Sequence, residues 1–270
     1  MKVSEKIAKF SKGLVTSAAD LVLFKIYLGA DWRLVGESSG EEAVGEWQGL
    51  EDAFPELPEL APRKILRALR LLLKLGLVEL VPYEACLVPQ ITEEGGKRLD
   101  SIFPVYNEKR PWDGKFYLVN YDIPVGKNSQ RDALRNFLKS IGCVMLQSSV
   151  WLTPYNPVKA LKDFAEKRKL SEKVLVSVLL EEFAPPVAEI YGLEEINQRY
   201  REFVERMTPL RPPSLLSELR EGFAGQDKMQ LAFDYFSILK DDPQLPFELL
   251  PKDWMGDRAQ ELFEKLFFEK

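Results

Sequence analysis

Five basic side chains within residues 62–75 are spaced so that they could contact a polyanion. They are Arg63, Lys64, Arg67, Arg70 and Lys74. Four of them follow one another at steps of four, three and four residues, which places them on one face of an α-helix. The opposite face is apolar and consists of Ile65, Leu66, Leu69, Leu72 and Leu73. We predict an amphipathic helix over Pro62–Leu75, with proline in its first turn and Gly76 at its end.

The cationic face of this helix favours a nucleic-acid partner. Like charges at helical spacing repel one another by a few tenths of a kcal/mol per pair. Phosphate groups would relieve that repulsion, because they neutralise the cations and release counterions. The alternative is a solvent-exposed charged face without a partner, which is common on helices. The elements around the helix must therefore decide between the two interpretations.

The remaining reactive residue types offer little catalytic chemistry. The chain contains no histidine, which excludes Ser-His-Asp and Cys-His nucleophilic catalysis, histidine-ligated zinc and histidine general bases. Its two cysteines, Cys86 and Cys143, are far apart and outside any CxxC motif. We expect both to be buried thiols in a reducing cytosol, and we predict a protein that is not an enzyme.

Charge is distributed unevenly along the 270 residues. The 37 basic and 42 acidic residues give a net charge of −5, which excludes a uniformly basic nucleic-acid binder but not a local basic patch. Residues 1–110 carry −2, residues 115–180 carry +6, and residues 181–270 carry −8. Proline-bearing segments at 103–111 and 184–186 lie near the changes in sign and predict domain boundaries.

The elements predicted around the cationic helix are those of a winged helix-turn-helix. Two helices precede it, at Thr16–Leu28 and Glu41–Leu50, and the apolar runs Leu77–Val81 and Ala85–Val88 predict a β-hairpin after it. Thr92 then caps a further helix. In this arrangement the third helix enters the major groove and the hairpin lies on the DNA backbone. The hairpin tip carries little charge, and the acidic run from 37 to 59 would have to face away from DNA.

The middle of the chain predicts a ferredoxin-like β-α-β-β-α-β domain. Its predicted strands are Lys115–Tyr121, Val144–Leu146, Ser149–Leu152 and Lys173–Leu180. One helix lies between Ser129 and Gly142, and the other covers Pro157–Lys169. The acidic last third predicts helices at Tyr191–Met207, Leu215–Phe223, Met229–Leu239 and Gly256–Phe268.

These elements predict an α+β protein with three domains. They are an N-terminal winged helix-turn-helix DNA-binding domain at residues 1–105, a central ferredoxin-like domain at 112–182, and a C-terminal helical domain at 187–270. Residues 14–28 are interrupted by polar side chains, so we expect neither a signal peptide nor a membrane span, and we expect a cytoplasmic location.

Two sequence segments carry a resemblance to a known family. The first is "LVNYDIP…QRDALRNFLKSIGCVMLQSSVWLTP" at residues 118–154, and the second is "LPFELLPKDWMGDRAQELFEKL" at 245–266. The first is similar to the CRISPR-associated nuclease-like ferredoxin fold. Together with the second, and with the preceding winged-helix-like region, it resembles the PaaX-type repressors of phenylacetic acid catabolism. The chain departs from that family at Leu66 and Leu71, where further arginines are frequent, so its preferred DNA sequence is expected to differ.

The resemblance implies a homodimeric transcriptional repressor that binds palindromic operator DNA. It implies no resident cofactor. It also implies that the ferredoxin-like domain at 112–182 mediates dimerisation and that the helical domain at 187–270 responds to an effector, an acyl-CoA such as phenylacetyl-CoA. No glycine-rich phosphate loop stands out in the sequence. We predict that Arg63 and Lys64 reach base edges or nearby phosphates, while Arg67, Arg70 and Lys74 neutralise phosphate.

Asp122 raises an alternative function. In the nuclease-like relatives, an aspartate at the end of the first strand can hold a divalent metal at the dimer seam, where two symmetry-related carboxylates could bind Mg²⁺. The competing interpretation, which we favour, is that Asp122 caps the turn before Pro124. The alternatives to a regulator are therefore a metal-dependent nuclease and a non-catalytic module of a CRISPR adaptation-type system.

Overall fold

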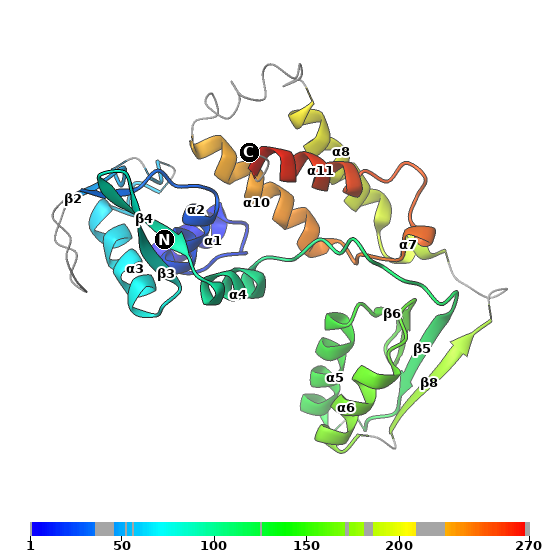
Figure 1. Ribbon diagram of the computed structural model, residues 1–270. Coiled ribbons are helices and arrows are strands. Elements are labelled where there is room, and N and C mark those ends of the chain that lie inside the picture. Colours follow the sequence, from blue (N-terminus) through cyan, green and yellow to red (C-terminus); the bar gives the residue numbers. More distant parts are fainter. Residues whose placement is uncertain are drawn as a thin grey trace. The chain divides into compact units, whose positions relative to one another are not determined.

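The computed structural model describes residues 2–35, 46–51, 53–55, 57–124, 126–170, 173–180, 186–208 and 225–267 (Figure 1). Within these residues the strands form two four-stranded sheets, and most other elements are α-helices. Both sheets are antiparallel, and their strands are separate in sequence from the C-terminal helices. The predicted α+β class is confirmed.

The chain divides into two compact units. The first contains residues 1–106, 199–241 and 255–270, and the second contains residues 107–198 and 242–254. C-terminal helices therefore belong to the same unit as the N-terminal region. The boundaries of three domains at 1–105, 112–182 and 187–270 stay a prediction.

The first unit begins with helices α1 (Val3–Phe10) and α2 (Ala18–Tyr27). The hydroxyl of Ser17 accepts a hydrogen bond from the backbone N–H of Asp20 and so caps α2. Helix α3 (Pro62–Lys74), the hairpin of β3 (Val78–Tyr83) and β4 (Cys86–Ile91), and α4 (Glu93–Ile102) follow in the predicted order. Helix α1 is an addition that the sequence pattern did not predict.

The predicted helix at Glu41–Leu50 is wrong in its described part. Residues 46–48 are strand β2 (Glu46–Gln48), which pairs with β1 (Arg33–Val35), and the sheet order is β2-β1-β4-β3. Gly49 follows at φ +82°, and a Cβ there would lie 2.4 Å from the carbonyl oxygen of Asp31. An α-helix cannot pass through that left-handed position without losing the strand pairing. Residues 41–45 lie outside the described residues.

The second unit contains the β-α-β-β-α-β segment. Its elements are β5 (Phe116–Tyr121), α5 (Asn128–Ser140), β6 (Val144–Gln147), β7 (Val150–Thr153), α6 (Val158–Arg168) and β8 (Val174–Leu179). The sheet order is β6-β7-β5-β8, and every neighbouring pair is antiparallel. Both helices cover the face of the sheet that carries Val119, Tyr121 and Trp151, where the core lies (Figure 1). The strands and helices predicted for this segment are found within three residues.

The last third of the chain is helical in the part that the structure describes. It contains α7 (Val187–Ile190), α8 (Leu193–Met207), α10 (Gly225–Asp241), a 3₁₀ turn η3 (Phe247–Leu249) and α11 (Gly256–Phe267). The helix predicted at Leu215–Phe223 lies outside the described residues. Among the described helices, none is both long and apolar enough to cross a membrane.

Aromatic packing holds α2, α4 and α10 together in the first unit. The ring of Phe24 on α2 lies 4.2 Å from that of Phe103, just after α4, and 4.9 Å from that of Phe233 on α10. Phe236 on α10 packs against Phe103 at 4.8 Å. These four rings are buried, so α2 and α4 have a fixed position relative to α10.

Candidate nucleic-acid interface

Helix α3 is positioned by its apolar stripe. Ile65, Leu69 and Leu72 are at most 1% exposed and pack against α2 and β3. Pro62 occupies the first turn, where a missing N–H leaves no hydrogen bond unmade. Burial of this stripe turns the other face of α3 outward, as the sequence predicts.

All five predicted DNA-binding residues are exposed on that outer face: Arg63, Lys64, Arg67, Arg70 and Lys74. Within the described residues, none of the five lies within 4.0 Å of a carboxylate. Lys64 Nζ donates a hydrogen bond to the carbonyl oxygen of Glu59 at 2.7 Å. The structure thus brings the five cations together on one exposed surface, with Glu59 as an acidic neighbour of Lys64.

Several other basic residues of the same unit form ion pairs. Lys6 lies 3.2 Å from Glu59, Lys97 lies 2.7 Å from Glu93, and Arg98 forms two hydrogen bonds to Asp20. These ion pairs contrast with α3, whose five cations have no carboxylate within 4.0 Å among the described residues.

Leu71 on α3 and Leu75, the residue that follows its last turn, are exposed leucines beside the cations. Leu71 is 45% exposed and Leu75 is 58% exposed. Leu71 lies one step after Arg70 and four after Arg67, so it interrupts the cationic face with an apolar side chain. The sequence pattern marked Leu71 only as a departure from the resembled family. Its exposure, which only packing decides, makes it a candidate for contact with a thymine methyl group.

The connection from α3 to α4 is held by close packing. The hydroxyl of Thr92 accepts a hydrogen bond from Gly95 N–H at 3.1 Å and donates one to the carbonyl oxygen of Gly76 at 2.6 Å. A Cβ on Gly95 would lie 2.0 Å from the carbonyl oxygen of Leu77. Glycine is therefore required where α4 crosses the turn after α3, and α4 and α3 cannot shift independently.

The hairpin of β3 and β4 offers little charge to a phosphate backbone. Its turn contains Glu84 at φ +51°, and the neighbouring Tyr83 is 53% exposed. The residues of the two strands and their turn include no lysine or arginine. Any contribution of this hairpin would come from Tyr83.

Part of the acidic run before α3 is neutralised by α1. A hydrogen bond from its own backbone N–H, together with Lys6, holds the pKa of Glu59 below its ordinary value. Lys6, Lys9 and Lys12 line the same hollow as Glu59. Residues 36–45 of the run lie outside the described residues.

Asp122 lies at the end of β5 in an exposed position. Its backbone N–H donates to the carbonyl oxygen of Lys173 at 3.0 Å, and the two residues line a shallow hollow of about 440 Å³ with Asn120, Tyr121 and Pro124. The described residues contain no group of three potential metal ligands. Among the described residues no further carboxylate lines the hollow, so a metal there would need the Asp122 of a second copy.

The two cysteines are free thiols. Cys143 is buried, and burial raises its pKa to about 12, so it stays protonated at neutral pH. Cys86 is half-buried and its sulfur donates to the carbonyl oxygen of Tyr83. Burial was expected for both residues and is complete only for Cys143.

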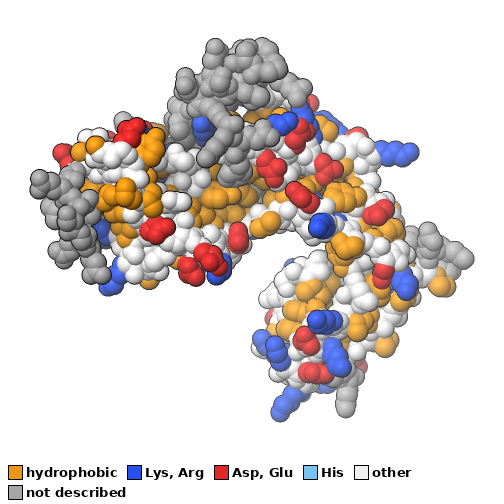
Figure 2. All heavy atoms as spheres, viewed as in Figure 1, with side chains coloured by type: hydrophobic (Ala, Val, Ile, Leu, Met, Phe, Trp, Pro, Cys, Tyr) orange, Lys and Arg blue, Asp and Glu red, His pale blue; other side chains and the backbone are white. Residues whose placement is uncertain are grey.

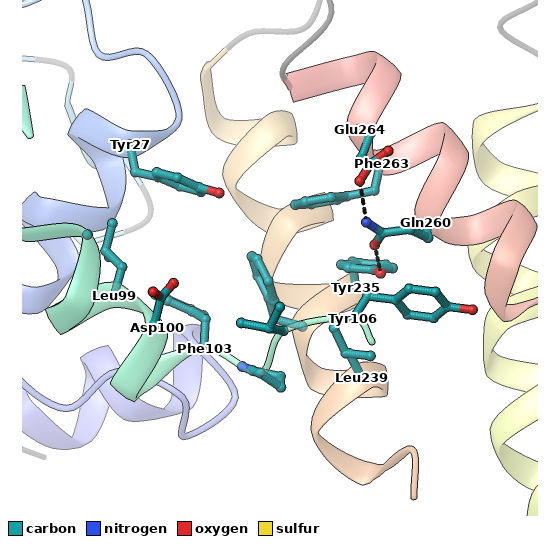
Figure 3. Close-up of a pocket in the computed structure, with 14 residues that line it drawn as sticks. Tyr27, Leu99, Asp100, Phe103, Tyr106, Tyr235, Leu239, Gln260, Phe263 and Glu264 are labelled. Atoms are coloured by element: carbon teal, nitrogen blue, oxygen red, sulfur yellow. Dashed lines mark hydrogen bonds between the residues drawn. The ribbon is translucent and has the colours of Figure 1, made fainter. Parts of the chain in front are cut away.

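The first unit contains an aromatic cavity of about 330 Å³ between α4, α10 and α11 (Figure 3). Its lining includes Tyr27, Phe103, Tyr106, Tyr235, Phe236 and Phe263. Tyr235 donates a hydrogen bond to Gln260, whose amide donates to Glu264 at 2.6 Å. Burial, and then the charge of Asp100, raise the pKa of Tyr27. The cavity can accept an aromatic or aliphatic group beside two carboxylates.

Comparison with known proteins identifies the family. Residues 109–181 match the PaaX protein central Cas2-like domain, and residues 191–269 match the PaaX-like protein C-terminal domain. The chain belongs to the PaaX-type family. The resemblance predicted from residues 118–154 and 245–266 is confirmed.

One curated PaaX-type protein and one solved structure are similar to this chain. Over 168 residues it is 26% identical to Transcriptional repressor PaaX of Escherichia coli (strain K12), which covers 58% of this chain and 52% of that protein. The matched stretch thus spans about half the length of this relative. The Uncharacterized protein Rv0674 from Mycobacterium tuberculosis shares the fold, with a TM-score of 0.56 and 17% identity over 93% of this chain and 94% of that one.

Proposed function

We propose that this PaaX-type protein is a cytoplasmic, DNA-binding transcriptional repressor without enzymatic activity. The observation that carries the proposal is the exposed face of α3, where five cations have no carboxylate within 4.0 Å among the described residues. Phosphates would neutralise these charges and release counterions, which makes duplex DNA the partner that the face fits best. The name of the relative from Escherichia coli supports this class of function.

In the proposed complex, α3 lies in the major groove as the recognition helix of a winged helix-turn-helix. Arg63 and Lys64, in its first turn, reach base edges or the phosphates next to them. Arg67, Arg70 and Lys74 neutralise phosphate along the groove. The close packing at Gly95 and the pairing of Arg98 with Asp20 hold α3 in register with α2 and α4.

A homodimer would place two copies of α3 on a palindromic operator. Edge strand β8 supports this part of the proposal, because Leu175 and Val178 within the strand and Leu180 just after it are each at least 55% exposed. Exposed apolar side chains on an unpaired sheet edge favour association with a second copy.

The aromatic cavity is the proposed effector site. Its rings suit the aryl or acyl group of an acyl-CoA such as phenylacetyl-CoA, with the phosphates of the CoA portion outside the cavity. The cavity is lined by α4, and α4 packs against the turn that follows α3 at Gly95. A ligand that moved α4 would therefore move the recognition helix and change the affinity for DNA.

The proposal is tested by selection from a pool of random duplexes with the purified protein. Enrichment of a palindromic sequence, and weaker binding of the selected duplex when phenylacetyl-CoA is added, are the expected results. A pool that shows no enrichment at any salt concentration contradicts sequence-specific recognition. If a duplex is selected but its affinity for the protein does not change when phenylacetyl-CoA is added, only the effector site is contradicted.

A further inference from the structure

The positive charge of the central segment lies entirely in its helical layer. Residues 115–180 carry a net charge of +6. Residues 127–139 and 159–169, which form α5, α6 and their caps, account for all of it, because the charges outside these two stretches cancel. Figure 2 shows Lys and Arg side chains gathered over the lower part of this unit, with acidic side chains between them.

We call the basic residues of these two stretches the cationic layer: Lys127, Arg131, Arg135, Lys139, Lys159, Lys162, Lys167, Arg168 and Lys169. Its six lysines are all exposed. Among the described residues, only Arg135 of this set lies within 4.0 Å of a carboxylate, at 3.9 Å from Asp132. The layer is therefore a concentration of cations that the described part of the chain does not neutralise.

The arginines of the layer contact other residues of the domain, whereas its lysines are exposed to solvent or to a partner. Arg131 donates to the carbonyl oxygen of Ile123 at 2.6 Å, and Arg135 donates to the hydroxyl of Tyr121 at 3.0 Å. The guanidinium of Arg168 lies 5.6 Å from the ring centroid of Phe164. The lysine ammonium groups are thus the part of the layer that remains available.

The two helices present these lysines on a rigid surface. Phe137 of α5 stacks on Phe164 of α6 with ring centroids 4.2 Å apart, and buried leucines fix both helices to the sheet. The opposite face of β5 contains Phe116, Leu118 and Asn120, none of which is charged. The domain thus has a cationic side and an uncharged side, and only the first suits a polyanion.

We propose that the cationic layer of α5 and α6 is a second phosphate-binding surface, which contacts the backbone of duplex DNA outside the bases read by α3. This proposal rests on the proposed function. Lysines on flexible stems suit phosphate contacts without base specificity. A single strand is disfavoured as the partner, because the aromatic rings of the layer stack on each other and do not offer exposed platforms for bases.

The salt dependence of binding tests the layer. We compare the full-length protein with Lys139→Gln/Lys162→Gln on a duplex that contains the selected operator and flanking DNA. If both lysines contact phosphates, the slope of log affinity against log salt falls in magnitude by about two. The matched control is Lys115→Gln/Lys252→Gln, which removes two exposed lysines of the same unit outside the layer and should leave the slope unchanged.

The outcomes separate this inference from the proposed function. If wild-type protein binds no duplex at all, the proposed function fails and the inference fails with it. If wild type binds and Arg67→Gln/Arg70→Gln weakens binding, while Lys139→Gln/Lys162→Gln matches the control, only the inference is overturned. Tighter binding of wild type to an RNA duplex than to the DNA duplex also overturns it.

Lysine acetylation of the wild-type complex gives a second readout that does not depend on variants. An amine-reactive reagent followed by mass spectrometry should modify Lys139, Lys159 and Lys162 more slowly when DNA is bound, with Lys115 and Lys252 unaffected. Slow modification of the layer already without DNA would mean that the acidic third of the chain covers it, and this result would contradict a free phosphate-binding surface. Equal rates with and without DNA would contradict it as well.

Discussion

At the residue scale, single contacts fix the position of α3 against its neighbours. Thr92 joins the end of α3 to the start of α4, and Arg98 joins α4 to Asp20 of α2. Gly95 permits this arrangement, since the carbonyl oxygen of Leu77 occupies the space of a side chain. These residues lie outside the cationic face but determine its position.

Gly95→Ala should destabilise the first unit by about 2 kcal/mol or more, because the added methyl would lie 2.0 Å from a backbone oxygen and 2.8 Å from Ile91 Cγ2. Urea unfolding monitored by circular dichroism measures the loss. Gly96→Ala is the matched control, since nothing lies within 4 Å of its Cβ position and alanine favours a helix by roughly 1 kcal/mol. Equal stability of the two variants would contradict the close packing at Gly95.

Asp234 makes stability depend on pH in the acidic range. Burial alone would raise its pKa, but hydrogen bonds from Lys12, Arg206 and Gln230 outweigh burial and lower it. The unfolded chain therefore takes up the proton first as pH falls. This contribution to stability is complete above the ordinary aspartate pKa of 3.8 and is lost as pH falls through the lower folded value.

The free energy of unfolding should therefore decrease below about pH 4, and the decrease should be shallower in Asp234→Asn. Chemical denaturation at a series of pH values between neutral and acidic gives the two curves. Asp241→Asn, which removes an exposed partner of Arg199, is the control and should keep the wild-type slope. A slope in Asp234→Asn as steep as that of wild type would contradict the proposed role of this carboxylate.

At the element scale, the periodicity of apolar residues predicts those helices and strands that bury one face and expose the other. Helix α3 begins at Pro62 as expected, and the middle segment follows the predicted order because its apolar residues alternate or recur cleanly. The helix prediction fails at strand β2 because three residues are too short to show a periodic pattern. Strand β2 joins the hairpin of β3 and β4 only through β1, which pairs with β4. Long-range pairing of this kind leaves no local signal.

The candidate site could be predicted in part for the same reason. The five cations follow from spacing alone, but the exposure of Leu71 and the aromatic cavity do not. Leu71 reads as one more apolar residue of an amphipathic helix, and only the position of α2 and β3 leaves it outside the core. The cavity forms only where α10 and α11 meet α4. Its lining residues on α4 and on α10 are more than 130 positions apart in the sequence, so no local pattern predicts it.

Leu71→Ala should weaken discrimination between operator and random duplex by roughly three- to tenfold, because a base contact is lost. It should leave the salt slope unchanged, since an apolar side chain releases no counterion. Competition titrations at two salt concentrations separate the two effects. Leu75→Ala, exposed at the end of α3, serves as the control. A changed salt slope with intact discrimination would contradict an apolar base contact.

At the scale of the whole molecule, one chain combines the cationic helix α3, an edge strand with exposed apolar residues and an acidic helical third. The overall charge of −5 conceals this arrangement, which is why the whole-chain composition says little about a DNA partner. The proposed dimer joins the parts, because it sets the spacing between two copies of α3.

Leu175→Lys/Val178→Lys should convert the proposed dimer into a monomer, since charges on edge strand β8 oppose pairing with a second copy. Sedimentation velocity reports the mass, and operator affinity should fall with it. Met145→Lys, on the exposed part of the other edge strand β6, should remain dimeric. A dimer that persists in the β8 variant and dissociates in Met145→Lys would assign the contact to the opposite edge.

The most direct measurement compares Arg67→Gln/Arg70→Gln with Lys115→Gln/Lys252→Gln in duplex titrations at two salt concentrations. Both variants lose two positive charges, but only the first loses them from α3. We predict that the α3 variant binds the duplex more weakly and that its salt slope falls by about two, while the control behaves as wild type. Equal affinity and equal slope for all three proteins would contradict the assignment of α3 to the DNA interface.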